Sequence, residues 1–298
     1  MSDRRTLPSA DLRTERTTLS ILQAIVLGIT QGLTEFAPVS SSGHLILVPW
    51  LFGWHILDDP DLNKTFDVAL HVGTLVGALV YFRRDVWRYL RVWIASIRAR
   101  RIETADQRLA WALVLGTIPG AAAGAVFEDV IQEKLGQPWL IAVMLAVFGV
   151  VLYVVDRHAA STLSIDDISV GRGVVLGVAQ AVALQPGVSR SGITMTVARW
   201  MGLDRESAAR FSFLLALPII AGAGAFKGLD LAREGFGGYA PEFFWGFVSS
   251  AISGFLVIWG LLRYLRRHDY RFFMLYRLVV AALVLVVIAT GVRSAAGV

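Results

Sequence analysis

Apolar runs long enough to cross a lipid bilayer recur along this chain, and they constrain its fold more than any other feature. Among them are FDVALHVGTLVGALVYF, WLIAVMLAVFGVVLYVV and LVVAALVLVVIAT. A helix needs about 20 mainly apolar residues to cross the hydrocarbon core. The chain also has a mean hydropathy of +0.60 and only 17% charged residues, unlike a soluble globular domain. The sequence therefore predicts an all-α integral membrane protein.

Six of these runs predict transmembrane helices, and they lie at residues 66–82, 110–128, 139–156, 207–226, 243–264 and 273–292. Two further apolar segments, 21–48 and 171–198, are interrupted by polar residues, proline and glycine. If either were a full crossing, basic and acidic loops would fall on the same side of the membrane. We therefore predict that both segments are re-entrant helical hairpins.

The charged loops give the chain an orientation. Arginine is dense in residues 83–108 and 263–271, whereas residues 54–64 and 127–136 are acidic or neutral. Short basic loops mark the cytoplasmic side, so we read the net charge of +5 as topological rather than as a sign of nucleic-acid binding. Residues 83–108 are also compatible with an interfacial helix or a solvated face.

Domain organisation follows from the same patterns. Residues 1–19 are polar and lack the apolar core of a signal peptide, which predicts a tail. Residues 20–292 form a single membrane domain, and residues 293–298 form a short C-terminal tail. The chain has no cysteine, so disulfides and thiolate chemistry are excluded, and any bound metal must be a hard cation.

A repeat relates the two interrupted segments. VLGITQGLTEFAPVSSSG, residues 26–43, aligns without a gap with VLGVAQAVALQPGVSRSG, residues 175–192, at a constant offset of 149. Repeat one then covers about residues 20–156 and repeat two about residues 171–292. Because each repeat holds an odd number of crossings, the second is inverted relative to the first. The two hairpins should therefore enter from opposite faces and meet near the midplane.

The first hairpin carries ionisable and hydroxyl side chains. Gln31 and Glu35 lie four residues apart, on one face of a helix. A carboxylate at membrane depth is a functional candidate, although a hydrogen bond to backbone freed at Pro38 would also explain Glu35. We expect Pro38 and Gly43, with Pro186, Gly187 and Gly192 of the second hairpin, to interrupt helix. The serines at 40–42 either cap the following helix or bind a ligand.

The second hairpin contains PGVSRSGIT, residues 186–194, in which a glycine turn, hydroxyls and an arginine open a helix. Backbone amides, a helix N-terminus and a guanidinium together suit a multivalent anion. Arg190 is either part of that receptor or a counter-ion of Glu35. Asp67 and His71, four apart at the start of a predicted crossing, either line the mouth of the site or serve as caps.

These motifs resemble those of the bacterial undecaprenyl pyrophosphate phosphatases of the bacitracin-resistance type (the UppP/BacA family). The resemblance rests on Gln31-x-x-x-Glu35 running into PVSSSGH, on PGxSRSGxT, and on segment order from about residue 20 to 292. It implies a hydrolase of the bacterial inner membrane that converts undecaprenyl pyrophosphate to undecaprenyl phosphate and inorganic phosphate. Such an enzyme recycles the lipid carrier of peptidoglycan synthesis, and its active site is expected to face the periplasm.

The resemblance also implies roles for individual residues. Those expected to be catalytic are Glu35, Ser41, His44 and Arg190. Those expected to bind substrate are Gln31, Ser40, Ser42, Ser189, Ser191, Gly192 and Thr194. A divalent cation, Mg²⁺ or Ca²⁺, is expected on Glu35. Many members have glutamate where this chain has Gln31, and an amide is a poorer metal ligand that cannot act as a base.

Several alternatives stay open at this stage. The nucleophile is Ser41 activated by Glu35 or His44, or water activated by Glu35, or His44 itself. An inverted repeat with broken helices also suits a polyprenyl phosphate carrier, a flippase or another secondary transporter. The cation, chain-length selectivity, a homodimer and lipid translocation are not determined by the sequence, nor is the role of residues 1–19.

Overall fold

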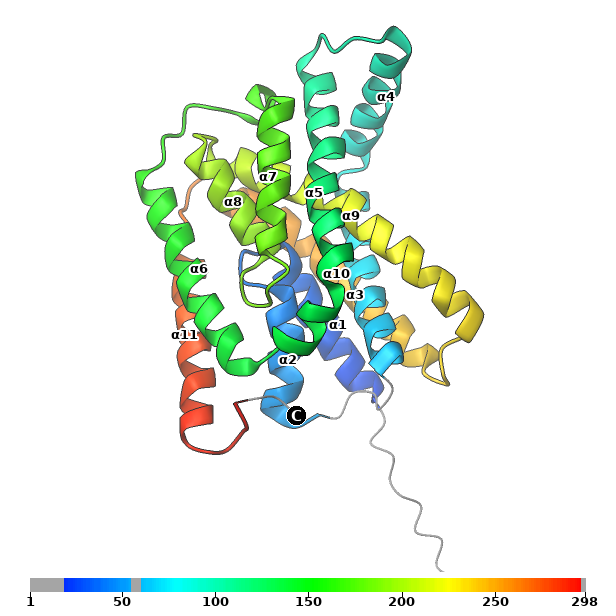
Figure 1. The fold of residues 1–298 in the computed structure, drawn as a ribbon, viewed down its shortest axis with the longest axis vertical. Coiled ribbons are helices and arrows are strands. Elements are labelled where there is room, and N and C mark those ends of the chain that lie inside the picture. The colour runs from blue at the N-terminus through cyan, green and yellow to red at the C-terminus, as the bar shows by residue number, and fades with distance from the viewer. Residues whose placement is uncertain (1–18, 55–59, 296–298) are drawn as a thin grey trace, which may run out of the picture.

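The computed structural model describes residues 19–54 and 60–295, without the side chains of residues 60, 128–134, 227, 230, 232 and 234. Within these residues all regular secondary structure is helical, apart from one isolated bridge between Leu163 and Leu203 (Figure 1). The helices are α1 Ile21–Phe36, α2 Ser41–Phe52, α3 Pro60–Tyr81, α4 Arg83–Ala99, α5 Ala105–Lys134, α6 Pro138–His158, α7 Val170–Val182, α8 Arg190–Trp200, α9 Arg205–Glu234, α10 Ala240–Leu265 and α11 Arg271–Ala289, with a short 3₁₀ helix at Ile165–Asp167.

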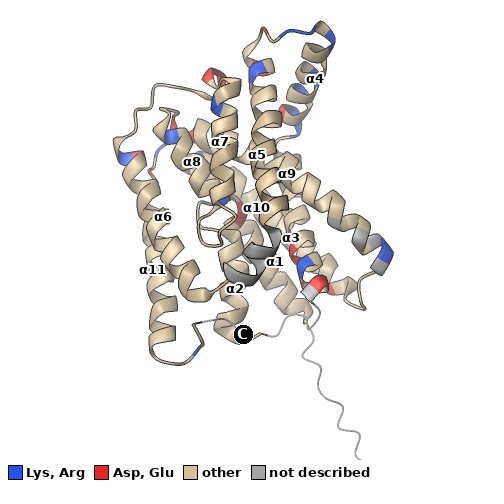
Figure 2. Cartoon of the chain, in the orientation of Figure 1, with Lys and Arg blue, Asp and Glu red and all other residues tan. Residues whose placement is uncertain are grey.

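Five helices in the described part are long and apolar enough to cross a membrane: α5, α6, α9, α10 and α11. They coincide with five of the six predicted crossings, and α3 occupies the place of the sixth. α3 has 22 residues, but it qualifies as a candidate crossing only together with α4, from which it is bent by 83°. Charged side chains lie mainly at helix ends and in loops (Figure 2). The prediction of an all-α, multi-pass membrane protein is confirmed.

Each predicted hairpin consists of two short helices separated by a break. α1 and α2 are separated at residues 37–40, and α7 and α8 at residues 183–189. Gly43 and Gly192 were expected to interrupt helix, but this expectation is wrong, because each lies in the first turn after the break. A Cβ on Gly43 would lie 3.3 Å from the amide nitrogen of Gly187. This glycine therefore permits the two hairpins to approach each other.

The two breaks end in the same backbone geometry. Ser40 has φ 75° and ψ 96°, and Ser189, at the aligned position, has φ 78° and ψ 115°. Both lie at positive φ, which non-glycine residues rarely adopt. In each hairpin the serine Oγ accepts the backbone N–H three residues later, at Gly43 and Gly192 respectively. The aligned serines therefore have the same capping role, as one of the two open interpretations proposed.

Aligned helices of the two halves pack reciprocally on the opposite half. α1 packs chiefly on α10, while α7 packs chiefly on α5. A Cβ on Gly28 would lie 2.3 Å from the carbonyl oxygen of Gly246 in α10. At the aligned Gly177, a Cβ would lie 2.0 Å from the carbonyl oxygen of Gly116 in α5. Absence of a side chain at these two positions is what lets the helix backbones come this close.

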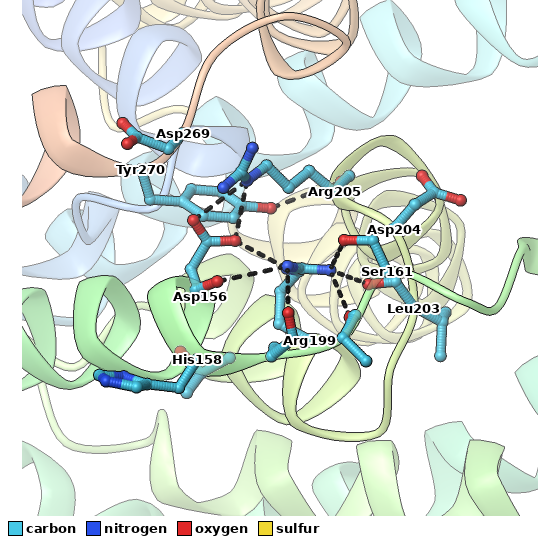
Figure 3. Close-up of polar contacts among 12 residues, drawn as sticks. Asp156, His158, Ser161, Arg199, Leu203, Asp204, Arg205, Asp269 and Tyr270 are labelled. Carbon is cyan, nitrogen blue, oxygen red and sulfur yellow. Dashed lines mark hydrogen bonds and ion pairs between the residues drawn. The ribbon is translucent and has the colours of Figure 1, made fainter.

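A buried ion network fixes the C-terminal end of the second hairpin (Figure 3). The carboxylate of Asp156, at the end of α6, accepts hydrogen bonds from Arg199 Nε at 2.7 Å and from Arg205 Nε at 2.9 Å. Arg199 is the penultimate residue of α8, yet its side chain is only 1% exposed. It also donates to backbone carbonyls, including that of Leu203. The network ties the C-terminal end of α8 to α6 and α9, and so fixes that end of the second hairpin.

The two predicted tails are only partly described. Leu19, at the end of the predicted N-terminal tail, is buried in a cluster with Leu27 of α1. The carbonyl of Ser294, in the predicted C-terminal tail, accepts a hydrogen bond from Trp50 Nε1 at 3.0 Å. The remainder of the N-terminal tail, residues 296–298 and parts of the acidic stretches 54–64 and 127–136 lie outside the described residues.

Candidate active site

Glu35 is the centre of a polar cluster formed by both hairpins and α3. It lies in the last turn of α1, and its side chain is 4% exposed. Its Oε1 accepts a hydrogen bond from Arg190 Nη2 of α8 at 2.6 Å, across 155 residues of sequence. Its Oε2 accepts a hydrogen bond from the hydroxyl of Ser41 at 2.6 Å. The carboxylate therefore links a hydroxyl of one hairpin to a guanidinium of the other.

Gln31 lies one turn before Glu35 on the same helix face, as the spacing predicts. Its Nε2 donates to Glu35 Oε2 at 2.9 Å, and the residue is fully buried. Its Oε1 is buried and has no hydrogen-bond partner in the described part of the chain. A buried polar atom without a partner is costly and points to a missing ligand group or water. Gln31 thus orients the carboxylate and offers an unused acceptor beside it.

The guanidinium of Arg190 has hydrogen-bond donors that its contact with Glu35 does not use. Its side chain is 19% exposed, and its second terminal nitrogen, Nη1, has no partner among the described residues. A guanidinium presents its donors as a planar fork that suits the oxygens of a phosphate. Both open interpretations of this residue, counter-ion of Glu35 and anion receptor, are therefore compatible with its position.

His71 of α3 reaches the same carboxylate. Its Nε2 lies 3.5 Å from Glu35 Oε2, and its side chain is 31% exposed. Its Nδ1 lies 2.8 Å from the backbone carbonyl oxygen of Asp67, which fixes the orientation of the ring. His71 therefore belongs to the Glu35 cluster itself, because its ring lies within 3.5 Å of the carboxylate. Asp67 contributes its backbone to this arrangement.

His44 lies apart from the Glu35 cluster. Its Nδ1 is 2.7 Å from the carbonyl oxygen of Ser40, and its Nε2 is 2.8 Å from the hydroxyl of Tyr276. The rings of His44 and Tyr276 are also stacked, with centroids 5.7 Å apart. Because the contact with a carbonyl favours a proton on Nδ1, Nε2 is the basic nitrogen. Neither nitrogen contacts Ser41, so the structure pairs Ser41 with Glu35.

Two of the other predicted substrate-binding hydroxyls, those of Ser40 and Ser191, connect the two hairpins. Ser40 Oγ accepts a hydrogen bond from the Gly187 amide at 3.0 Å, and Ser191 Oγ donates to the carbonyl of Ala37 at 3.0 Å. Thr194 Oγ1 bonds to the hydroxyl of Ser212 at 2.5 Å. The remaining predicted residues lie beside them. The hydroxyl oxygens of Ser42 and Ser40 are 3.4 Å apart, and those of Ser189 and Ser191 are 3.1 Å apart. The backbone N–H of Gly192 donates to Ser189 Oγ.

Arg277 is a residue that the motifs did not single out. It is fully buried in α11, and its guanidinium donates to the carbonyl of Pro38 at 3.2 Å in the first break. It also donates to the carbonyls of Gly187 and Val188 in the second break, at 2.7 and 3.1 Å, and to Leu145 at 2.8 Å. The signal in the sequence was an arginine inside the predicted crossing 273–292, which is rare and functional by default.

The oxygen donors around Glu35 fit a cation that is shared with a ligand. Within the described residues no group of three or more His, Asp or Glu side chains could hold a metal by itself. Among the described residues of the cluster, Glu35 supplies a carboxylate and Gln31 supplies an unpartnered Oε1 as oxygen donors that suit a hard cation. Mg²⁺ commonly takes one or two carboxylates and completes its shell with substrate phosphates and water.

Comparison with known proteins assigns the chain to a family. Residues 24–283 match the family described as bacitracin resistance protein BacA. This chain is a member of the BacA family. A protein of Desulforudis audaxviator named undecaprenyl-diphosphatase is 47% identical to this BacA-family chain over 267 residues, which cover 89% of this chain and 97% of the relative.

Two further relatives carry the same name. The Pelotomaculum thermopropionicum protein is 45% identical over 271 residues, covering 91% of this chain and 98% of its own length. The Nocardioides protein is 41% identical over 279 residues, covering 93% of this chain and all of its own length. The matched region of this BacA-family member contains both hairpins, and so includes the whole Glu35 cluster.

Proposed function

We propose that this BacA-family chain hydrolyses undecaprenyl diphosphate to undecaprenyl phosphate and inorganic phosphate. The observation that carries the proposal is the single carboxylate, Glu35, placed between the Ser41 hydroxyl and the Arg190 guanidinium at 2.6 Å from each. Phosphoryl transfer to a hydroxyl requires a base that accepts the hydroxyl proton and a positive group that neutralises charge on the phosphoryl oxygens. Glu35 and the Arg190 guanidinium can supply these two functions. The names of relatives at 41–47% identity support the same substrate.

In the proposed reaction Ser41 is the nucleophile. Its Oγ attacks the terminal phosphorus while Glu35 accepts its proton, and the bond from that phosphorus to the bridging oxygen breaks. Arg190 neutralises charge on the transferring phosphoryl group through its unpartnered Nη1. Undecaprenyl phosphate leaves, and water then cleaves the phosphoserine to release inorganic phosphate. The sequence left the base open between Glu35 and His44, and the 2.6 Å contact favours Glu35.

His44 has a separate proposed role, as donor of a proton to the leaving lipid phosphate. The proton would come from Nε2 of the ring in its doubly protonated, imidazolium form, and Nε2 is the nitrogen that now bonds to the Tyr276 hydroxyl at 2.8 Å. The ring is held for this task by the carbonyl of Ser40 at Nδ1. A carbonyl partner at one nitrogen sets the tautomer and the direction of the other, which is a common arrangement for acid–base histidines.

The proposal includes a divalent cation, Mg²⁺ or Ca²⁺, which Glu35 and Gln31 Oε1 would hold together with the substrate. When bound, such an ion offsets charge on the diphosphate oxygens. Gln31 contributes a neutral oxygen, so the protein supplies one negative charge and the lipid supplies the rest. Loss of activity on chelation, restored by either ion, is the expected result.

The membrane arrangement that we propose is six crossings and two re-entrant hairpins in an inverted repeat. Helices α1, α2, α7 and α8 have 16, 12, 13 and 11 residues, each short of the roughly 20 that a crossing requires. Matched breaks and the reciprocal packing of α1 and α7 support the repeat. The arginine-rich loops support a cytoplasmic location for the α4 end, and the active site would then open to the periplasm across the inner membrane.

The test is phosphate release from undecaprenyl diphosphate by purified protein in detergent with Mg²⁺ or Ca²⁺. Wild type is compared with Glu35→Gln and Arg190→Gln, and Arg157→Gln at an exposed helix end serves as the control. Both site variants should lose at least about a hundredfold in rate, since each removes an electrostatic partner of the transition state. Bound but intact lipid with folded wild type would instead favour a lipid carrier.

A further inference from the structure

An apolar groove lies beside α4, away from the Glu35 cluster. It has a volume of about 310 Å³ and runs between α3, α4, α5 and α9. Leu79 of α3, Leu90 and Trp93 of α4, Val114 of α5 and Leu217 of α9 are among its lining residues. Its lining includes no charged side chain, so the groove suits a hydrocarbon chain rather than a polar ligand.

α4 has the three faces expected of a helix at a membrane interface. One face, with Tyr89 and Ser96, is buried against the protein. A second carries exposed apolar side chains three or four residues apart, at Trp87, Leu90, Ile94 and Ile97. The third is basic. A helix with exposed apolar and arginine-rich faces lies at the headgroup level of a bilayer.

The basic face consists of Arg84, Arg91 and Arg98, which recur every seven residues and are exposed. Within the described residues none of the three has an acidic partner, although Arg91 lies over the ring of Trp87. Residues 83–108 hold eight arginines against three acidic residues, an excess that equals the +5 of the whole chain. Positive charge on this protein is therefore concentrated on α4, which forms one wall of the groove, and in the loop that follows it.

We propose that the groove binds an acyl chain of an anionic glycerophospholipid whose phosphate lies against the arginines of α4. The order of residues along the chain fits such a lipid. α3 carries His71 of the active site, then the groove residues Leu75 and Leu79, and leads directly into the arginines of α4. A headgroup at α4 would thus place its chain toward the interior of the membrane domain.

Two polar groups on the groove wall suit the glycerol ester region of this lipid. The hydroxyl of Tyr89 accepts a hydrogen bond from Arg88 Nη2 at 2.6 Å, so a polar boundary exists at the groove. Trp93 Nε1 is buried and has no hydrogen-bond partner in the described part of the structure. After a small rotation of the indole, an ester carbonyl would satisfy it. A polyprenyl chain has no such acceptor, which distinguishes the two classes of lipid.

Lipid retention tests the proposal without any measurement of phosphate release. The full-length protein is exchanged into mixed micelles of phosphatidylglycerol and phosphatidylcholine, and the lipids that stay bound are counted by native mass spectrometry. The test variant is Arg84→Gln/Arg91→Gln/Arg98→Gln. Its control removes three exposed arginines elsewhere, as Arg157→Gln/Arg267→Gln/Arg271→Gln, so both variants have the same net charge.

Wild type and the control should retain phosphatidylglycerol over phosphatidylcholine, and the α4 variant should lose about fivefold of that preference for each arginine removed. Filling the groove with Ala221→Phe should release the bound lipid, whereas Ala223→Phe on the opposite face of α9 should not. Trp93→Phe should weaken retention by removing only the N–H group.

Three outcomes would overturn the proposal. Equal loss in the two triple variants would mean that the preference reflects overall charge. Retention that survives Ala221→Phe would mean that the lipid lies outside the groove. Displacement of phosphatidylglycerol by added undecaprenyl phosphate would assign the groove to the substrate tail. Phosphate release can fail in any variant without affecting these readouts, so the proposed function is tested separately.

Discussion

At the scale of single residues, the site depends on how many partners one carboxylate has. Glu35 accepts hydrogen bonds from Gln31, Ser41 and Arg190, and it lies 3.5 Å from His71. A carboxylate buried at membrane depth is stable only when it is paired in this way. Each partner therefore serves both the stability of the carboxylate and its proposed chemistry, and variants must separate the two effects.

Replacement of Ser41 tests the nucleophile. Ser41→Ala keeps the helix and removes only the hydroxyl that donates to Glu35. Phosphate release should fall by at least about a thousandfold, since a covalent route loses its attacking atom. Wild type quenched in acid during turnover of substrate labelled in its terminal phosphate should carry label on Ser41. Substantial residual activity in Ser41→Ala, with no label on wild type, would identify water as the nucleophile.

His71 is predicted to assist Glu35 rather than to react. His71→Ala should slow release about tenfold, the loss expected for one contact with a charged group. His71→Gln should recover part of the rate, because a polar side chain can still reach Glu35. The value of kcat should change more than KM if the contact matters mainly during reaction. An unchanged rate in His71→Ala would show that the 3.5 Å contact has no part in catalysis.

At the scale of helices, each hairpin is held by partners from outside itself. Arg277 of α11 reaches the carbonyls of Pro38, Gly187 and Val188, which the breaks free from helical bonding. Free carbonyls inside a membrane domain must find donors, since hydrocarbon offers none. One buried guanidinium supplies them to both hairpins, and so fixes how closely Glu35 and Arg190 approach.

Substitution of Arg277 should therefore destabilise the protein more than its position in an apolar helix suggests. Arg277→Met removes donors from several buried carbonyls, and we expect a loss of about 3–5 kcal/mol in the free energy of unfolding. Arg277→Lys keeps the charge but has fewer donors, so its loss should be smaller. Thermal unfolding in detergent measures both, with Arg267→Met as an exposed control. Equal midpoints for Arg277→Met and that control would contradict this prediction.

At the scale of the whole molecule, the inverted repeat that we propose would explain why the site is formed by two halves of the chain. α1 and α2 bring the carboxylate and the hydroxyl, while α8 brings the guanidinium. The halves also interlock, because α1 packs on α10 and α7 packs on α5. Separation of one repeat from the other would thus expose helix faces that each half buries in its counterpart.

Absence of native cysteine makes the membrane orientation directly measurable. Single variants Ala99→Cys, at the end of α4, and Ala240→Cys, at the start of α10, should lie on opposite sides of the membrane. In intact cells an impermeant maleimide should label only Ala240→Cys, and Ala99→Cys should react after permeabilisation. Labelling of both from the same side would contradict the proposed order of crossings.

The sequence alone determined the helices, their breaks and the repeat. Apolar runs, proline and capping serines act over a few residues, so crossings such as 139–156 and the break at 37–40 were predictable. The repeat was visible because Ser40 and Ser189 align at a constant offset, and the structure gives both the same positive φ. Local patterns failed at Gly43 and Gly192, where glycine serves close packing instead of a break.

Tertiary structure alone decided which of the candidate side chains meet. Sequence left Ser41 with two possible bases, and packing put Glu35 at 2.6 Å while turning His44 toward Tyr276. It also gave Arg277 its partners in both breaks, which lie 90 and 239 residues away in the chain. Such contacts depend on how helices from both repeats pack together. A pattern within a short stretch of sequence cannot specify contacts between residues so far apart in the chain.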